Sequence, residues 1–313
     1  MQPKDMLAAG STTSSPLRRV AIVRNAASGT AGSRGDCHQA LADATALEHA
    51  ALTTVDITDD SGPAEIAAAL GPQQDLVIVA GGDGTVRAAA EALKSRGIDA
   101  PLLPLPCGTV NLHSKLLYPE LSPAQVLARL PQRRVTHVPA GYLNGRLFLL
   151  SVGVGFPATA ASARELLRYG RLEAVPALVS KAISAFEEAG QDQLRISAGG
   201  NMAGEHGAAL IASPIGIDRL VSPSSSRQQT RGALDCALIR DAGPVDRLGL
   251  AVSALRASWR RNPSIETFSS AWLEVVEQRP LSVILDGEPS ECQPALNLSF
   301  EPAAVPVITL PIE

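Results

Sequence analysis

A short segment of this sequence has the composition of a phosphate-binding turn. It consists of Gly81, Gly82, Asp83, Gly84 and Thr85, between an apolar run at 76–80 and a helix-forming run. Glycines at a strand-to-helix turn let the backbone approach a ligand closely, and the unpaired amides at the start of the helix favour phosphate oxygens. The segment therefore predicts a site for the phosphates of a nucleotide.

Asp83 needs an explanation of its own, because a carboxylate beside a phosphate site repels the ligand unless a cation lies between them. The role that this position predicts is the organisation of Mg²⁺ on the phosphates. The alternative is a tight turn whose aspartate caps the following helix. A short glycine-rich motif alone does not separate the two interpretations.

Two further polar turns follow predicted strands. The run 20–23 leads into a turn at 24–30, and the run 102–105 leads into a turn at 106–111. Ligands bind at the carboxyl edge of open parallel sheets, and three polar turns at one such edge favour a binding site over a purely structural role. The remaining candidate nucleotide contacts are Asn25, Ser28, Gly29, Thr58, Gly108, Thr109 and Asn111.

The elements that hold these turns are expected to form an α/β domain. Short β-branched runs alternate with Ala- and Leu-rich segments, which predicts an open parallel sheet with strands at 20–23, 55–57, 76–79 and 102–105. Helices are expected to begin at Pro63 and near Thr85. A capping box formed by Ser122 and Gln125 predicts another helix that ends near Leu130.

After about Thr136 the pattern changes to that of a second, strand-rich domain. Its strand-like runs lie at 148–152, 210–212, 237–239, 283–285 and 296–300, with helical stretches at 157–189 and 245–260 and a low-complexity loop at 222–230. We expect a flexible tail at 1–17, the α/β domain at 18–136 and the second domain at 137–300. The segment 301–313 is a candidate to return to the first domain.

Composition disfavours several classes of protein. The 313-residue chain is 45% hydrophobic and has a net charge of −4, which argues against a disordered protein and against general nucleic-acid binding. The sequence contains no uninterrupted apolar run of 18 residues, which a membrane-spanning helix would need. We therefore expect a cytoplasmic protein with peripheral membrane contact. Reduced thiols without metal-ligand spacing are expected for Cys37, Cys107, Cys236 and Cys292.

Two carboxylates follow the apolar run 281–285. If the chain stays extended, side-chain alternation places Asp286 and Glu288 on one face, where they can share Mg²⁺ or divide acid–base work. Glu288 is the candidate general base, taking the proton of an acceptor hydroxyl as it attacks a γ-phosphate. The alternative is a hairpin turn, because Asp-Gly is a strong turn dipeptide.

A basic stripe lies in the helical stretch after Gly155. Arg164, Arg168 and Arg171 are spaced by four and three residues, with apolar residues between them. Such a helix can lie against an anionic bilayer and admit a lipid to the site. The alternative, a solvated charged face, is the commoner meaning of a charge run.

Taken together, these segments resemble the diacylglycerol-kinase catalytic superfamily, which includes bacterial lipid kinases and the sphingosine and ceramide kinases. The matching segments are GGDGT at 81–85, GTxN at 108–111, the NPxSG-like turn at 25–29 with Ala26 for proline, the glycine turn at 153–156 and the acidic motif at 286–288. The resemblance implies an α/β nucleotide domain and a β-sandwich-like domain, with ATP and lipid meeting in a cleft. It also supports Glu288 as the base.

Some positions depart from the family pattern. Arg87 and Ala88 stand where many members carry Asn-Glu, and Leu112 replaces a common aspartate. Some members hold a structural magnesium near an acidic DG turn, but Arg231 precedes the glycine here, so that site is not carried over. These departures affect the positions that would tune metal binding.

The sequence therefore predicts a kinase that uses ATP and Mg²⁺, with Asp83 and Asp286 as metal-binding candidates and Glu288, Asp83 and Asp286 as catalytic ones. The expected acceptor is a diacylglycerol-like or ceramide-like membrane lipid on an anionic surface. The alternatives are a kinase of a soluble acceptor such as NAD, and a catalytically silent lipid- or nucleotide-binding module. Nothing in the sequence fixes the oligomeric state.

Overall fold

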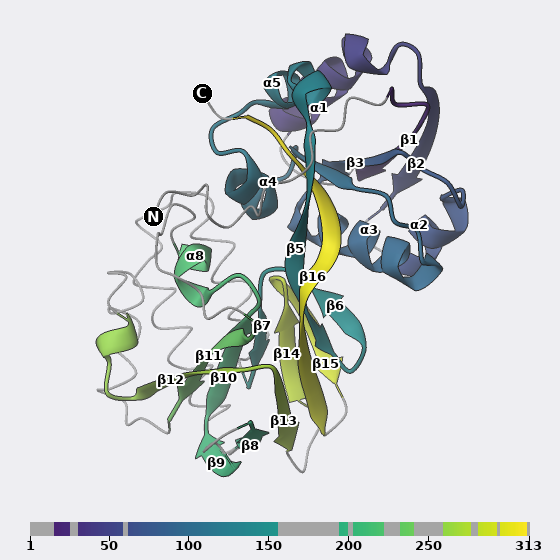
Figure 1. Cartoon of the computed structure of the whole chain (residues 1–313). Helices are drawn as coiled ribbons and strands as arrows, with labels where there is room; N and C mark the ends of the chain where they lie inside the picture. Colours follow the sequence, from purple (N-terminus) through teal and green to yellow (C-terminus); the bar gives the residue numbers. More distant parts are fainter. Residues whose placement is uncertain are drawn as a thin grey trace. The chain divides into compact units, whose positions relative to one another are not determined.

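The computed structural model describes residues 16–25, 31–58, 62–155, 194–199, 203–221, 232–240, 259–276, 281–292 and 295–311. The chain divides into two compact units, each with its own sheet structure (Figure 1). We call them unit 1 (Met1–Val138 with Ala303–Glu313) and unit 2 (Pro139–Pro302). Because β5 and β16 each begin in one unit and end in the other, they connect the two units covalently.

Unit 1 is built on a parallel sheet. Its strands lie in the order β2-β1-β3-β4, and the last part of β16 extends the sheet by pairing with β4 at Val307 and Leu102. The strands are β1 (Arg19–Asn25), β2 (Ala51–Ile57), β3 (Leu76–Gly81), β4 (Leu102–Pro106) and β16 (Leu296–Thr309). Since all of these pairs are parallel, the carboxyl ends of β1 to β4 lie along one edge.

Helices cover both faces of this sheet. Figure 1 shows α1 and α5 on one face and α2 and α3 on the other. The helices are α1 (Ala31–Ala42), α2 (Pro63–Ala69), α3 (Asp83–Arg96), α4 (Leu112–Leu117) and α5 (Pro123–Ala128), with 3₁₀ turns η2 (Thr45–Leu47) and η3 (Leu130–Gln132). The predicted α/β domain with an open parallel sheet is confirmed.

Local sequence explains where several of these elements end. At Gly97 the chain takes φ 62°, the left-handed conformation that favours glycine after a helix. The predicted capping box at α5 is present, with the Ser122 hydroxyl accepting from the Gln125 amide. However, α5 ends at Ala128 and not near Leu130, because Pro131 cannot donate the next helical hydrogen bond.

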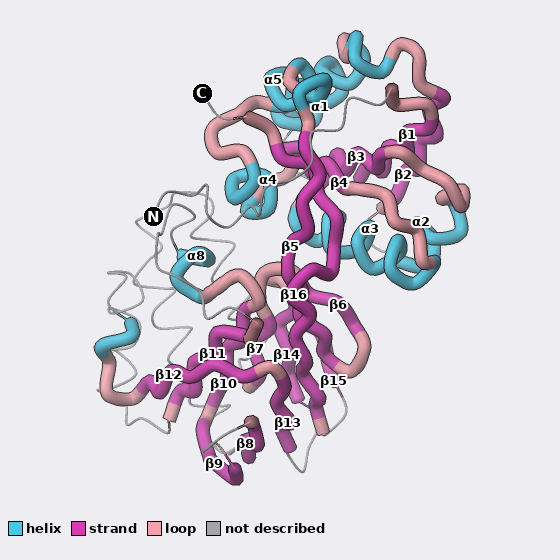
Figure 2. Tube along the Cα trace, viewed as in Figure 1, coloured by secondary structure: helices cyan, strands magenta, loops and turns pink. Residues whose placement is uncertain are grey.

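Unit 2 contains two sheets of mainly antiparallel strands. These strands are magenta in Figure 2. One contains the first part of β16 with β13 (Trp272–Val276), β8 (Leu194–Ala198), β9 (Ala203–Gly207), β5 (Arg134–Leu143) and β6 (Arg146–Phe148). The other has the order β12 (Ile265–Ser270), β11 (Leu234–Ile239), β10 (Ala209–Ser213), β7 (Val152–Val154), β14 (Leu281–Leu285) and β15 (Glu288–Cys292). A short helix, α8 (Ile217–Val221), follows β10, and the 3₁₀ turn η5 (Trp259–Arg261) precedes β12.

The two sheets of unit 2 share one apolar core. Alternate residues of both contribute to it, including Ile196 and Val275 from one sheet and Leu210 and Val283 from the other, all completely buried. This is the packing of a β-sandwich, in which inner faces interdigitate and outer faces meet solvent. The predicted strand-rich second domain is therefore confirmed.

Several expectations concern segments outside the described residues. These are the helical stretch at 157–189, most of the one at 245–260, the loop at 222–230 and the basic stripe of Arg164, Arg168 and Arg171. Within the residues that are described, no helix is long and apolar enough to cross a membrane.

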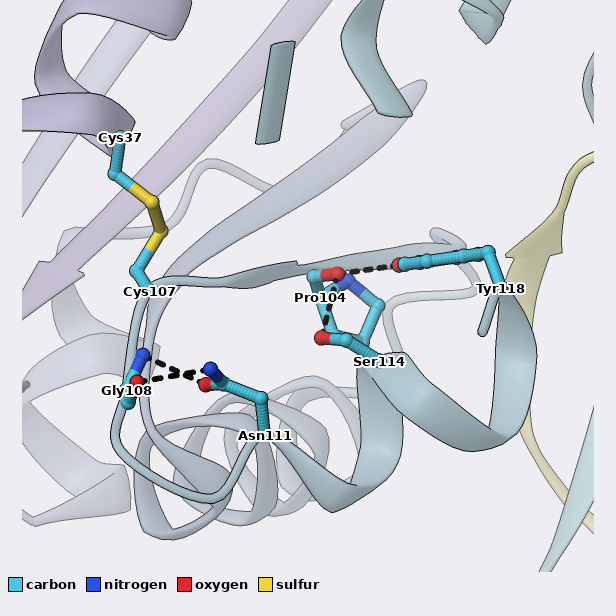
Figure 3. The surroundings of a disulfide bond; sticks show 7 residues. All are labelled: Cys37, Pro104, Cys107, Gly108, Asn111, Ser114 and Tyr118. Atoms are coloured by element: carbon cyan, nitrogen blue, oxygen red, sulfur yellow. Dashed lines mark hydrogen bonds between the residues drawn. A yellow bond between two sulfur atoms is a disulfide. The ribbon is translucent and has the colours of Figure 1, made fainter. Parts of the chain in front are cut away.

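The cysteines differ from the sequence expectation. Cys37 on α1 and Cys107 after β4 form a disulfide, with Cα atoms 5.9 Å apart (Figure 3). The expectation of reduced thiols was wrong for this pair, because it rested on spacing along the chain, whereas pairing depends on how α1 packs beside β4. Cys236 is a buried free thiol, and burial raises its pKa.

A partly buried ion cluster fastens α8 and η5 to β11 in unit 2. The Arg260 guanidinium bonds Asp218 at 3.0 Å and Asp235 at 2.5 Å, and it lies 4.3 Å from the ring centre of Trp259. Asp218 also accepts from the Trp259 indole, and Asp235 accepts from the amide of Ile217. Asp218 therefore joins α8 to η5, and Asp235 joins β11 to both α8 and η5.

Because the Arg260 side chain is only 19% exposed, its removal leaves two shielded carboxylates without their cation. We expect Arg260→Met to lower the free energy of unfolding by about 2–3 kcal/mol, somewhat less than for a fully buried ion pair. Urea denaturation measures this directly.

The matched control is Arg240→Met in the same unit. Arg240 pairs with Glu205 and Glu266, but all three side chains are more than one-third exposed, so we expect a loss of only about 0.5–1 kcal/mol. Equal losses for the two variants would contradict a special role for the Arg260 cluster.

Candidate functional site

The GGDGT turn joins β3 to α3 with little free space at its first glycine. A Cβ added to Gly81 would lie 2.5 Å from the Thr85 Oγ1, so the buried Thr85 side chain fills the space that any larger residue would need. Gly82 precedes the helix in an extended conformation without a side-chain cap. The turn is therefore held by Thr85 folding back onto it, and its first helical residue is Asp83.

The GTxN turn packs directly against this segment. A Cβ at Gly108 would lie 2.5 Å from the Gly82 Cα, so the two turns touch backbone to backbone. Asn111 fixes the local shape (Figure 3): its Oδ1 accepts from the Gly108 amide at 2.6 Å, and its Nδ2 donates to the Gly108 carbonyl at 2.8 Å. Asn111 itself has φ 55°, a left-handed conformation that asparagine tolerates.

Asp83 connects the two turns through hydrogen bonds. Its carboxylate accepts from the backbone amides of Leu112 at 3.1 Å and His113 at 3.0 Å, and its Oδ1 lies 3.0 Å from the His113 Nδ1. Burial alone would raise the pKa of Asp83, but the hydrogen bonds and charge of His113, with the Leu112 amide, hold that pKa at about 2. Asp83 thus remains ionised and secures the start of α4.

His113 is a residue whose role sequence reasoning missed. Nothing in its neighbourhood along the chain predicts a partner, because Asp83 lies 30 residues earlier. α4 is further fixed to β4 by the hydroxyls of Ser114, within the helix, and Tyr118, directly after it, which both donate to the Pro104 carbonyl (Figure 3). The only available signal was the position of His113 two residues after the asparagine of the GTxN segment.

The other nucleotide-binding candidates follow neighbouring strands. Asn25 ends β1 opposite Ile57, the last residue of β2, and Thr58 is the next residue along the chain. In the same sheet Gly81 lies opposite Pro106, which places the turns after β3 and β4 side by side. Ser28 and Gly29 lie outside the described residues. Nucleotide binding by this set stays a prediction.

In unit 2 the acidic motif forms a tight hairpin. Asp286 and Gly287 have φ of 50° and 93°, and Leu285 on β14 pairs with Glu288 on β15. The chain therefore reverses direction between the two carboxylates, and the expectation that both share one face of an extended strand was wrong. Asp286 is buried, whereas Glu288 is exposed.

Asp286 organises the segment that enters β7. Its carboxylate accepts from the amides of Leu149, Leu150 and Ser151 at 2.8–2.9 Å, and its own amide donates to the Ser151 carbonyl. The glycine turn at 153–155 follows directly, and Gly153 pairs with Ile284 on β14. The structure thus brings the acidic motif and the glycine turn together within unit 2.

Two observations bear on a protein-held magnesium. Within the described part of the chain, no three or more His, Cys, Asp or Glu side chains are grouped to hold a metal ion. Asp83 and Asp286 each direct both carboxylate oxygens to backbone amides. The arrangement does not fit direct ligation of a metal by these two residues, so no step is derived through a metal that they would hold.

One of the family departures has a clear structural place. Arg87 is buried in α3, and its guanidinium lies 3.3 Å from Glu91 one turn later. The side chain is thus part of the packing of α3. Leu112, another of the departures, is buried at the start of α4 and contributes its amide to Asp83.

Known proteins resemble this chain in sequence and in fold. The model of the diacylglycerol kinase catalytic domain family matches residues 19–166. A Pseudomonas aeruginosa protein named "Probable lipid kinase YegS-like" is 30% identical over 260 residues, which cover 81% of this chain and 83% of that protein. A Pseudomonas putida protein of the same name is 29% identical over 265 residues, covering 80% and 83%.

Solved structures share the fold at lower identity. A diacylglycerol kinase from Bacillus anthracis superposes with a TM-score of 0.65 at 16% identity, covering 95% of this chain and 98% of that one. A second structure from the same organism gives a TM-score of 0.68 at 17% identity, covering 94% and 98%. At this identity the likeness concerns the fold alone.

The lowered pKa of Asp83 predicts an acid-sensitive contribution to stability. A carboxyl group whose pKa is lower in the folded than in the unfolded protein stabilises the folded state at pH values above 3.8, the ordinary pKa of the group. That stabilisation is lost as the pH falls toward 2. At about 1.4 kcal/mol per pKa unit, we expect a loss of about 2 kcal/mol over this window. Asp83→Asn should make the acid limb of the stability curve shallower by that amount, measured by urea denaturation at several pH values.

Asp99→Asn is the control for this experiment, because Asp99 is an exposed carboxylate of the same unit. We expect its acid limb to follow the wild-type curve. A wild-type acid limb in Asp83→Asn would show that Asp83 is not held by these hydrogen bonds.

The contact between the two glycine turns predicts a steric effect. In Gly108→Ala the new Cβ meets the Gly82 backbone, so the GTxN turn must move, and we expect ATP affinity to fall by about 10-fold or more. Calorimetric titration with ATP measures the change. Gly35→Ala on α1 is the control, because a Cβ there meets nothing within 4 Å; unchanged ATP affinity in folded Gly108→Ala would remove this turn from the nucleotide site.

Proposed function

The chain belongs to the diacylglycerol kinase catalytic domain family, and from this premise we propose that it is a lipid kinase that transfers the γ-phosphoryl group of ATP to a lipid hydroxyl. The observation that supports this most directly is the junction of the GGDGT and GTxN turns at the carboxyl edge of the unit 1 sheet. Gly82 and Gly108 touch there, and Asp83 ties the turns together. Glycine-rich turns at the ends of parallel strands are suited to a nucleotide phosphate.

In this proposal unit 1 holds ATP mainly through backbone groups. The three glycines of the GGDGT turn remove the side chains that would keep phosphate oxygens away, and α3 begins at the same place. Asp83 does not face the ligand as a bare charge, because backbone amides and His113 already hydrogen-bond its ionised carboxylate. Magnesium then enters as part of the MgATP substrate and offsets phosphate charge during transfer.

Glu288 is the proposed general base. Its side chain is exposed at the start of β15, directly after the hairpin turn, whereas Asp286 is buried and holds the 149–151 segment. Of the two carboxylates in the acidic motif, Glu288 is therefore the one that an acceptor hydroxyl can reach. A base in this reaction accepts the proton and orients the hydroxyl, while positioning and charge stabilisation supply most of the rate.

The proposed acceptor is a membrane lipid of the diacylglycerol or ceramide type, phosphorylated by a protein that associates peripherally with the membrane. The relatives from two Pseudomonas species carry lipid kinase in their names, which supports the lipid class without distinguishing head groups. Contact with an anionic surface through Arg164, Arg168 and Arg171 remains part of the proposal.

The test of the acceptor uses radiolabelled ATP, purified protein and mixed micelles of diacylglycerol or ceramide, with NAD as a soluble acceptor. Label in a lipid fraction is the expected result. Label in NAD alone would replace the lipid proposal with a soluble-acceptor kinase. ATP binding without transfer to any acceptor would indicate a silent binding module.

The role of Glu288 predicts a separation of binding from turnover. Glu288→Gln keeps the size of the side chain but removes the base, so we expect kcat to fall by about 10²-fold while ATP affinity changes little. Lipid phosphorylation and ATP titration on the same preparation measure the two quantities, with thermal unfolding as the check on folding.

Glu274→Gln on β13 is the matched control, because it removes a carboxylate from unit 2 outside the acidic motif. It should retain wild-type turnover. Wild-type turnover in Glu288→Gln would instead assign this residue to the hairpin alone.

A further inference from the structure

The Cys37–Cys107 disulfide joins a helix of unit 1 to one of its proposed nucleotide turns. Cys107 is the residue immediately before Gly108, and Cys37 lies in the middle of α1 (Figure 3). The bond connects positions 70 residues apart in sequence. The disulfide therefore ends at the residue next to Gly108, whose backbone contacts Gly82.

The two ends of the bond differ in how firmly other contacts hold them. The Cys107 side is fixed by the Gly108–Asn111 hydrogen bonds and by the attachment of α4 to the Pro104 carbonyl. In α1 the side chains described at 35–42 include only two buried ones, Cys37 at 4% and Ala40 at 6% exposure. Few of the described side chains of α1 are buried, and the helix also packs against α5, so the disulfide adds a covalent attachment between α1 and this turn.

We propose that Cys37 and Cys107 are positioning residues for the nucleotide site: their disulfide holds α1 against the 107–111 turn, and its reduction loosens both and weakens ATP binding. Neither sulfur touches the nucleotide. The effect on ATP rests on the proposed function, whereas the effect on α1 and the turn does not. The same bond makes the site responsive to the thiol–disulfide state of its surroundings.

The chemical step is a two-electron exchange with a low-molecular-weight thiol. A thiolate attacks one sulfur, the Cys37–Cys107 bond breaks, and a mixed disulfide forms. A second thiol releases the protein sulfur, leaving two protein thiols and one small disulfide such as oxidised glutathione. The reverse exchange reforms the bond. Because both sulfurs are buried, the exchange requires a local opening of α1.

Hydrogen exchange tests the structural half of the proposal on the full-length chain. We expect reduction with a thiol to increase amide exchange in α1 and at 107–113, with no change in β12 and β13 of unit 2. The Cys37→Ser/Cys107→Ser variant should resemble the reduced protein and stop responding to the reductant. The Cys236→Ala variant is the control and should respond as wild type does, because Cys236 lies in β11 of unit 2. Unchanged exchange in α1 and the turn on confirmed reduction would overturn the proposal.

Titration with ATP tests the functional half. A loss of preorganisation on this scale is expected to weaken ATP binding by about 3- to 10-fold, with kcat at saturating ATP nearly unchanged. Equal or tighter binding by the reduced protein would overturn the proposed effect on ATP. If neither form binds ATP but exchange still rises on reduction, the proposed kinase function fails while the positioning role of the disulfide stands.

Discussion

The arrangement of the glycine turns in unit 1 depends on the backbone contact between Gly82 and Gly108. The parallel register places Gly81 beside Pro106, so the turns after β3 and β4 leave the sheet at the same height and must share a narrow space. A side chain at Gly108 would meet the Gly82 backbone, and the Asn111 amide bonds both backbone groups of Gly108. The left-handed conformation of Asn111 belongs to this same turn.

Asp83 shows how a charged residue can fix the backbone beside a glycine-rich turn. Its carboxylate is ionised and nearly buried, but amides and an imidazole surround it, so it acts as a fixed anchor for α4. Asp286 in unit 2 follows the same principle, with three amides around one carboxylate and a backbone segment held in return. In both units an acidic residue of a glycine-rich motif shapes the backbone, whereas Glu288, the exposed carboxylate of the acidic motif, makes neither of these backbone attachments.

Much of the fold was predictable from local patterns. β-branched runs located the parallel strands, the capping box began α5 at the right residue, and three turns were expected along one edge. The failures share a physical cause, since each depended on contacts distant in sequence or on a backbone reversal. Alternation gave the wrong faces for Asp286 and Glu288 because Asp286 and Gly287 are both left-handed and form a turn. The Cys37–Cys107 bond and the His113 contact with Asp83 each join residues that are distant in sequence.

The path of β16 has a consequence for synthesis. The strand that covers the outer edge of β4 comes from the last residues of the chain, after the whole of unit 2 has been made. A nascent chain therefore carries β4 with this edge unpaired until β16 has been made, and an unpaired edge is a template for wrong pairing. The late pairing of β16 with β4 is the step that closes this edge.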